Sequence, residues 1–216
     1  MNTKHHPSST GRLMGAATAE ALRIAHRSQQ IVSDIIADES PEGKIKQRVV
    51  MATGNPQFAE LLRFGHNPIK AGIAAIRAGT NLYTDINMVR VGITKDIARF
   101  GGKAICALPE SGDVSDEELT RASAGLSQLG KHLTDSIVVI GNAPSAALTV
   151  AKMVHEGVKP ALLVATPVGF VNAAESKEQI RQLKIPSITS VGTQGGTPVA
   201  VAVVNELISM SFRQIG

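Results

Sequence analysis

The sequence predicts an α/β protein of three layers, in which a mostly parallel sheet carries helices on both faces and follows a helical N-terminal segment. Three strand-to-helix units in the second half support this prediction. In each unit a short apolar or β-prone run ends at a turn containing glycine or proline and leads into a helix-forming stretch. Consecutive units of this kind build a parallel sheet. They span residues 135–148, 160–177 and 186–207.

The turns of these three units are the first candidate for a binding site. A helix N-terminus leaves backbone N–H groups unpaired, and in open α/β sheets ligands gather beyond the carboxyl ends of the strands. We therefore expect the turns to converge on one pocket that suits a carboxylate or a phosphate. For any single turn the alternative stays open that its glycines only shape the turn. The candidate residues are Asn142, Glu175, Ser176, Gly195 and Gly196.

The first half is predicted to be helical at its start and to supply the first two strands. Apolar periodicity and glycine or proline breaks indicate helices over 15–36, over 42–64 with a break at 53–56, and over 67–79. Strands are expected over 81–85 and 103–108. The second strand holds Cys106, which is predicted to be a small buried core residue.

An acidic loop between residues 109 and 118 is expected to be solvated. Within it, Ser115 and Glu118 have the spacing of a capping box for a helix that runs through Leu129.

Length and composition favour one cytoplasmic domain spanning residues 1–216. A chain of 216 residues buries a sizeable core, and a single cysteine excludes an internal disulfide and indicates a reducing compartment. The first residues lack the apolar stretch of a signal peptide, and no apolar run is long enough to span a membrane. No membrane partner is expected.

The charged and aromatic residues narrow the class of ligand. The net charge is +4, and the basic residues are scattered along the chain, which weakly favours an anionic ligand. Aromatic residues make up 3 % of the chain, so stacking platforms for nucleic acid are scarce and no nucleic-acid partner is expected. The sequence has no phosphate-binding loop, dinucleotide fingerprint or nucleophile elbow, and its histidines lack metal-ligand spacing.

Several segments together resemble the precorrin-8X methylmutases of corrin biosynthesis. The specific ones are GNAPSAAL from residue 141, PVGFVNAAESK from residue 167 and GGTPVAVAVVNEL from residue 195. Less specific segments occur in the same order as in the family over most of the chain, among them RSQQIVSDII and AGIAAIRAGTNLYTDINMVRVGIT. The resemblance implies an α/β homodimer that moves a methyl group from carbon 11 to carbon 12 of the corrin macrocycle, giving hydrogenobyrinic or cobyrinic acid. It implies no redox cofactor and no protein-bound metal.

One position departs from the family pattern. The resemblance assigns the proton relay to a histidine in an Arg-x-x-His-Ala-x-Gly motif, and here the motif reads Arg48 to Gly54 with Met51 at the histidine position. A thioether has no proton to exchange near neutral pH. Met51 is therefore expected to line the pocket, with Arg48 and Thr53 of the same motif as substrate contacts. His66 is the nearest histidine in sequence and is the alternative proton donor, although the resemblance gives no reason to place it over the ring.

The resemblance also implies roles for four further residues. Arg121 lies in a Thr-Arg-Ala motif, and its guanidinium would hold a carboxylate and stabilise charge during the shift. Ser28 corresponds to a substrate contact, although Gln29 follows it where the family has an aromatic residue. Asp85 and Met88 match an Asp-x-x-Met turn, in which the aspartate caps a loop or touches the ligand.

Three functions remain open at this stage. The first is an active methylmutase that uses another proton donor or substrate-borne protons. The second is a corrinoid-binding homologue that lost the catalyst with the histidine, which only the residue at position 51 distinguishes from the first. The third is a phosphate- or nucleotide-binding module, for which the sequence offers no ribose or base contact.

Overall fold

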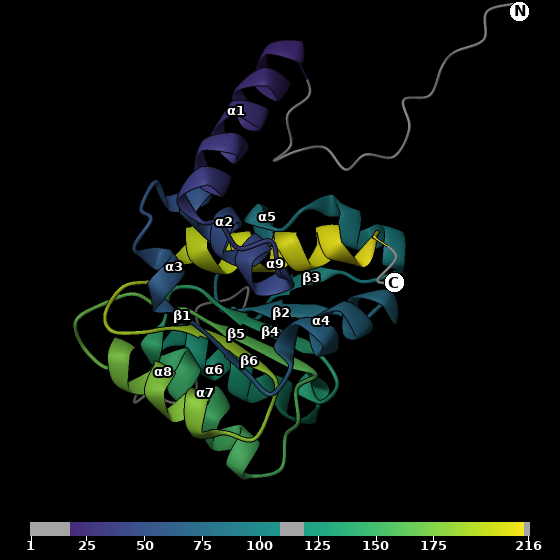
Figure 1. The fold of residues 1–216 in the computed structure, drawn as a ribbon. Coiled ribbons are helices and arrows are strands. Elements are labelled where there is room, and N and C mark those ends of the chain that lie inside the picture. Colours follow the sequence, from purple (N-terminus) through teal and green to yellow (C-terminus); the bar gives the residue numbers. More distant parts are fainter. Residues whose placement is uncertain (1–17, 109–118, 214–216) are drawn as a thin grey trace, which may run out of the picture.

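The computed structural model describes residues 18–108 and 119–213 and forms a three-layer α/β fold (Figure 1). The central sheet has six strands in the order β1-β6-β5-β4-β2-β3. Strand β1 pairs with β6 in antiparallel orientation, and the other neighbours are parallel. This confirms the predicted fold class. The strands are β1 (Leu62–Gly65), β2 (Leu82–Thr84), β3 (Ala104–Cys106), β4 (Ile137–Ile140), β5 (Leu162–Ala165) and β6 (Ser187–Ser190).

Helices cover both faces of the sheet. Figure 1 shows α2, α4, α5 and α9 on one face and α6, α7 and α8 on the other. The first face carries α2 (Pro41–Thr53), α4 (Pro68–Arg77), α5 (Asn87–Gly92) and α9 (Thr197–Ser211). The second face carries α6 (Arg121–Leu129), α7 (Pro144–His155) and α8 (Ala173–Gln182). The remaining elements are α1 (Ala19–Ile35), the short α3 (Phe58–Leu61) and the 3-10 helices η2 (Lys95–Phe100) and η3 (Gly130–Leu133).

Alternate residues of each central strand feed two separate apolar cores. Val139 and Val164 pack with α4 and α9 on the first face, whereas Val138 and Leu163 pack with α6 and α7 on the second. Because both faces are buried, β4 and β5 read as continuous apolar runs, as parallel strands do. Helix α9 is apolar over most of its surface because it lies between the sheet and α2.

The sheet has a topological switch point between β2 and β4. From β2 the chain continues outward to β3, and from β4 it builds toward β5 and β6 on the other side. Ligands of open α/β sheets bind at such a point, beyond the carboxyl ends of the strands. The three predicted turns all leave this edge, because β4, β5 and β6 are parallel.

Two predictions in the first half are wrong. Residues 62–64, expected to end a helix, belong to the edge strand β1, because their backbone pairs with β6. Cys106 is half-buried and not part of the core, because β3 is the other edge strand. The short helices α5, η2 and η3 were not predicted.

The predicted helix ends are mostly correct. Helix α4 ends before Gly79, whose φ of 75° suits glycine. Helix α6 is capped by Thr120, whose side chain accepts from the Ser123 N–H. The predicted capping box at Ser115 and Glu118 lies outside the described residues, and so does the start of the first predicted helix.

Candidate functional site at the carboxyl edge of the sheet

The backbone N–H groups of the turn between β4 and α7 are hydrogen-bonded to a side-chain carboxylate of the protein. Asp85, which follows β2, accepts hydrogen bonds from the N–H groups of Gly141, Asn142 and Ala143 at 3.1, 2.9 and 2.9 Å. Burial raises the pKa of this carboxyl, and the three N–H donors partly offset the rise. The expectation that this turn offers free N–H groups to a ligand is therefore wrong, because Asp85 holds them.

The turns after β5 and β6 are bound to each other. The Gly169 N–H donates to the Thr193 carbonyl at 3.1 Å, and the Gly196 N–H donates to the Thr166 carbonyl at 2.7 Å. Gly195 lies so close to β5 that an added Cβ would sit 2.2 Å from the Thr166 oxygen. Only glycine fits at this position.

The third turn also meets the first. A Cβ added at Gly141 would lie 2.7 Å from a Val89 methyl on α5 and 3.2 Å from the Thr197 Cα at the start of α9. The turns after β4 and β6 are therefore in contact through Gly141 and Thr197. The three turns converge as predicted. However, fewer of their backbone N–H groups are unpaired than expected.

Arg121 is the first residue of α6, at the same edge. Its neighbour Thr120 lies 2.8 Å, hydroxyl to hydroxyl, from Ser145 in the first turn of α7. This contact places the exposed Arg121 beside the turn that carries Asn142, whose side chain is also exposed. A guanidinium here can reach a carboxylate bound beyond the β4–α7 turn.

The Arg48 to Gly54 motif forms the second half of α2. Arg48 is mostly buried, and its guanidinium lies 3.6 Å from the Glu206 carboxylate of α9. Burial raises the pKa of Glu206, and Arg48 opposes this rise. The Thr53 hydroxyl donates to the Val49 carbonyl at 2.9 Å. Arg48 and Thr53 therefore already have partners within the protein.

Met51 is half-buried and packs against a small apolar cluster of Val32, Val50 and Ala59. The chain that follows it reaches the edge with the three turns, because the Leu61 carbonyl accepts from the Val191 N–H at 2.9 Å. Position 51 thus combines apolar packing with partial exposure.

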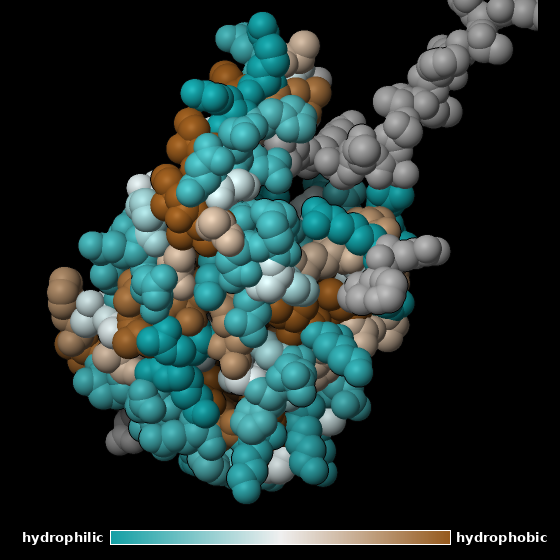
Figure 2. Space-filling view, viewed as in Figure 1, coloured by the Kyte–Doolittle hydropathy of each residue, from teal (hydrophilic) through white to brown (hydrophobic). Residues whose placement is uncertain are grey.

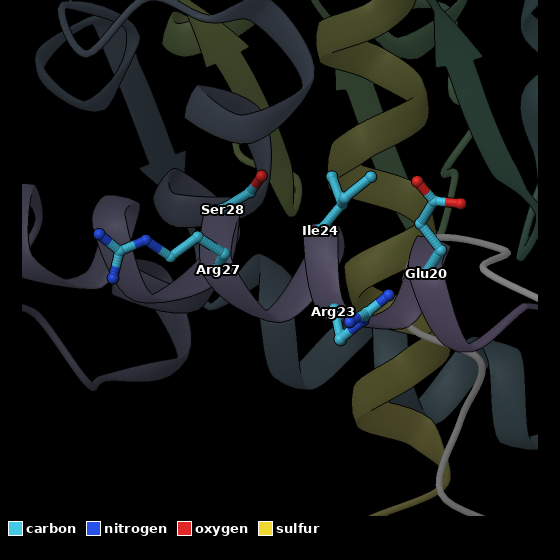
Figure 3. Close-up of a pocket in the computed structure, with 5 residues that line it drawn as sticks. All are labelled: Glu20, Arg23, Ile24, Arg27 and Ser28. Carbon is cyan, nitrogen blue, oxygen red and sulfur yellow. The ribbon is translucent and has the colours of Figure 1, made fainter.

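Ser28 lies on α1, the helix that projects from the body of the molecule (Figure 1). It borders an open depression of about 400 Å³ whose described lining comes from this one helix (Figure 3). In Figure 3 the side chains of Glu20, Ile24 and Ser28 point from the same side of α1. A depression bordered by one helix does not enclose a ligand, so Ser28 needs a further surface opposite it.

The other predicted residues differ in their access to a ligand. Met88 of α5 is 64 % exposed, and Glu175 in the first turn of α8 is exposed. Ser176 is fully buried, and its hydroxyl donates to the Ala173 carbonyl of its own helix at 3.2 Å. Ser176 therefore packs within the fold and is not accessible to a ligand.

His66 lies at the wrong edge of the sheet to replace the family histidine. It follows β1, which runs antiparallel to β6 and ends where Gly65 pairs with Ser187 at the start of β6. The three turns lie at the opposite end of β6, beyond Ser190. His66 is therefore not a proton donor for a ligand at these turns.

The described residues contain neither a cluster of metal-binding side chains nor a helix that could span a membrane. Within residues 18–108 and 119–213, no three histidine, cysteine or acidic side chains are grouped as a metal site would require. No helix in this part of the chain has both the length and the apolar character needed to cross a membrane.

One charged residue of the site was not anticipated. Lys177 of α8 is fully buried, and its ammonium contacts Ser190 and Gln194 at the third turn. No pattern in the sequence predicts this burial, since a lysine in a polar helix is ordinarily exposed.

These features define an α/β protein with a topological switch point in its sheet and three strand-to-helix turns in contact at the carboxyl edge. The sequence profile of the precorrin-8X methylmutase family CbiC matches residues 23–210, and the chain belongs to this family. Its members are isomerases.

Individual relatives agree with this assignment. The chain is 40 % identical over 209 residues to the cobalt-precorrin-8 methylmutase of Methanocaldococcus jannaschii, covering 91 % of this chain and 97 % of the relative. It is 38 % identical over 171 residues to the precorrin-8X methylmutase of Pseudomonas aeruginosa, covering 76 % and 82 %. The crystal structure of the precorrin-8X methylmutase from Thermus thermophilus superposes with a TM-score of 0.80 at 30 % identity, covering 87 % of this chain and 96 % of that one.

Proposed function

We propose that this protein is a precorrin-8X or cobalt-precorrin-8 methylmutase, an isomerase that moves one methyl group within the corrin macrocycle. The observation that carries the proposal is the family match over residues 23–210, which includes all three turns at the carboxyl edge. The acetate and propionate groups of the macrocycle suit a crevice beside the Arg121 guanidinium and the β6–α9 turn. The product is hydrogenobyrinic or cobyrinic acid.

The residues of this chain bind and orient the ring in our proposal. Arg121 holds a carboxylate, Asn142 and Met88 border the crevice, and Met51 supplies an apolar contact. The shift needs a proton delivered to the ring and later returned, and Met51 has none to give. A donor other than residue 51, or a proton that the substrate carries, supplies this proton, and tight positioning makes the transfer effective.

We further propose a homodimer that forms through α1. Ile24, Ile31 and Ile35 lie on one side of this helix and are 61 %, 46 % and 52 % exposed. Figure 2 shows brown, apolar surface along the projecting helix. Ser28 lies on the same side, so a second copy that covers the isoleucines also provides the surface opposite Ser28. A single domain over residues 1–216 and a cytoplasmic location complete the proposal.

An isotope experiment tests the reaction. Substrate carrying ¹³C in the migrating methyl group is incubated with the purified protein, and the product is examined by carbon NMR. A methyl resonance that changes to one bonded to the neighbouring ring carbon supports the proposal. A label that stays on its original carbon after prolonged incubation contradicts it.

A further inference from the structure

The ammonium of Lys177 is directed at one backbone carbonyl. Its Nζ lies 2.7 Å from the Gln194 oxygen and 3.2 Å from the Ser190 hydroxyl, which itself donates to the Gln194 oxygen at 2.8 Å. No carboxylate within residues 18–108 and 119–213 forms an ion pair with it. Because a buried charge is ordinarily paired, this arrangement calls for a physical explanation.

The position of the Gln194 carbonyl fixes the direction of the next N–H group. A trans peptide is planar, and its C=O and N–H bonds point in opposite directions. Since the Gln194 oxygen faces Lys177 in the interior, the Gly195 N–H points away from α8. In the described part of the chain this N–H has no acceptor, and Gly195 is half-exposed.

A second polar group beside this peptide also has no partner. The Thr166 hydroxyl is fully buried and makes no hydrogen bond to any described residue. Thr166 is the residue against which Gly195 is pressed and whose carbonyl accepts from Gly196. The β6–α9 turn therefore retains the unpaired backbone donor that the β4–α7 turn has lost to Asp85.

We propose that Lys177 is a positioning residue for the methylmutase: through the Gln194 carbonyl it directs the Gly195 N–H into the crevice, where this N–H binds a carboxylate of the macrocycle. This inference rests on the proposed function, because it takes the anionic macrocycle as the ligand. The buried positive charge behind the peptide also favours an anion on its outer side.

The first test compares Lys177→Met with Lys184→Met, which removes an exposed lysine just after the end of the same helix. Steady-state kinetics and absorbance titration with hydrogenobyrinic acid give KM, kcat and Kd. We expect Lys177→Met to raise KM and Kd about tenfold or more, as the loss of a charge-assisted contact does, and to change kcat less. Lys184→Met should match the unmodified protein.

An amidated derivative of the product makes the test specific for a carboxylate. If Gly195 binds a carboxylate, the difference in Kd between Lys177→Met and the unmodified protein shrinks when the ligand carboxylates are converted to amides. Unchanged KM and Kd in Lys177→Met, or the same loss with both ligands, would overturn the inference.

A second measurement needs no variant, so it holds even if Lys177→Met fails to fold. Gln194–Gly195 is the only Gln-Gly pair in the chain, so labelling with carbonyl-¹³C glutamine and ¹⁵N glycine selects the Gly195 amide alone in an NMR spectrum. Addition of hydrogenobyrinic acid should shift this proton downfield and slow its exchange with water. An amide that stays unchanged while the ligand binds would contradict the inference.

The outcomes separate the inference from the proposed function. An unmodified protein that neither binds nor converts the substrate contradicts the function. An unmodified protein that converts substrate, with Lys177→Met equal to it, contradicts only the role of Lys177.

Discussion

The carboxylate of Asp85 lies 2.9 Å from the backbone nitrogen of Asn142, across the switch point between β2 and β4. The same oxygen accepts from Ala143, and the second oxygen accepts from Gly141. An internal anion thus occupies the N–H groups at the start of α7, where a sheet of this type ordinarily offers them to a ligand. In our proposal the ligand therefore binds beside Arg121 and the β6–α9 turn.

Replacing Asp85 with asparagine should destabilise the fold. The amide keeps one acceptor oxygen but turns an NH₂ group toward backbone donors, leaving buried N–H groups unpaired. We expect Asp85→Asn to lower the free energy of unfolding by about 2–3 kcal/mol, measured by urea denaturation at pH 7. The control is Asp135→Asn, at an exposed residue with φ of 58° that asparagine adopts readily. Equal stability of the two variants would contradict the anchoring role of Asp85.

The buried Lys177 should make stability depend on pH in the alkaline range. Burial, with a smaller effect of Arg181, lowers the pKa of this ammonium from 10.5 to about 8. Between these values the unfolded chain binds the proton and the folded chain does not, so the contribution of Lys177 to folding improves as the pH rises.

We expect the unfolding free energy of the unmodified protein, relative to Lys177→Met, to rise by about 1–2 kcal/mol between pH 7.5 and 9.5. Other titrating groups cancel in this difference. Urea denaturation at several pH values measures it, and Lys184→Met should show the same slope as the unmodified protein. A difference that does not change with pH would show that Lys177 titrates as an exposed lysine does.

Restoring histidine at position 51 should accelerate the shift. Met51→His places a group with a pKa near neutrality where the family motif has its proton relay, and general acid catalysis contributes about 100-fold or more. We expect kcat to rise by at least about tenfold and to fall at the pH where the new imidazole titrates. The control Met51→Leu keeps the apolar packing and should leave kcat near that of the unmodified protein. A Met51→His protein that binds substrate without faster conversion would contradict our placement of residue 51.

The apolar side of α1 should determine the oligomeric state. We expect Ile31→Lys to convert the proposed dimer to a single chain of 22.6 kDa, measured by light scattering after size exclusion. Gln30→Lys introduces the same charge at an exposed position on a different side of the helix and should leave the dimer intact. If both variants keep the mass of the unmodified protein, α1 is not the interface.

The elements that could be predicted are those with a local signal. β4 and β5 are apolar runs buried on both faces, and Pro144 and Pro198 mark the starts of the helices that follow the first and third turns. β1 could not be predicted, because four residues between a helix and a turn become a strand only through pairing with β6. Sequence spacing does not encode such a partner.

The general location of the candidate site could be predicted from the sequence, but the hydrogen-bond and ion-pair partners of its residues could not. The convergence of the three turns follows from parallel strands, whereas the contact of Asp85 with a turn more than fifty residues away depends on strand order. In the same way Arg48 was expected to touch substrate and instead pairs with Glu206, which is far along the chain. Long-range electrostatic partners of this kind require the tertiary structure.

The measurement that tests the central claim most directly is an absorbance assay of the purified protein with precorrin-8 or its cobalt complex. The methyl shift changes the chromophore, and binding alone does not produce the spectrum of the product. Our account predicts catalytic conversion to hydrogenobyrinic or cobyrinic acid, over many turnovers, by a protein with methionine at position 51. Stoichiometric binding without conversion would contradict it and would identify a corrinoid-binding protein instead.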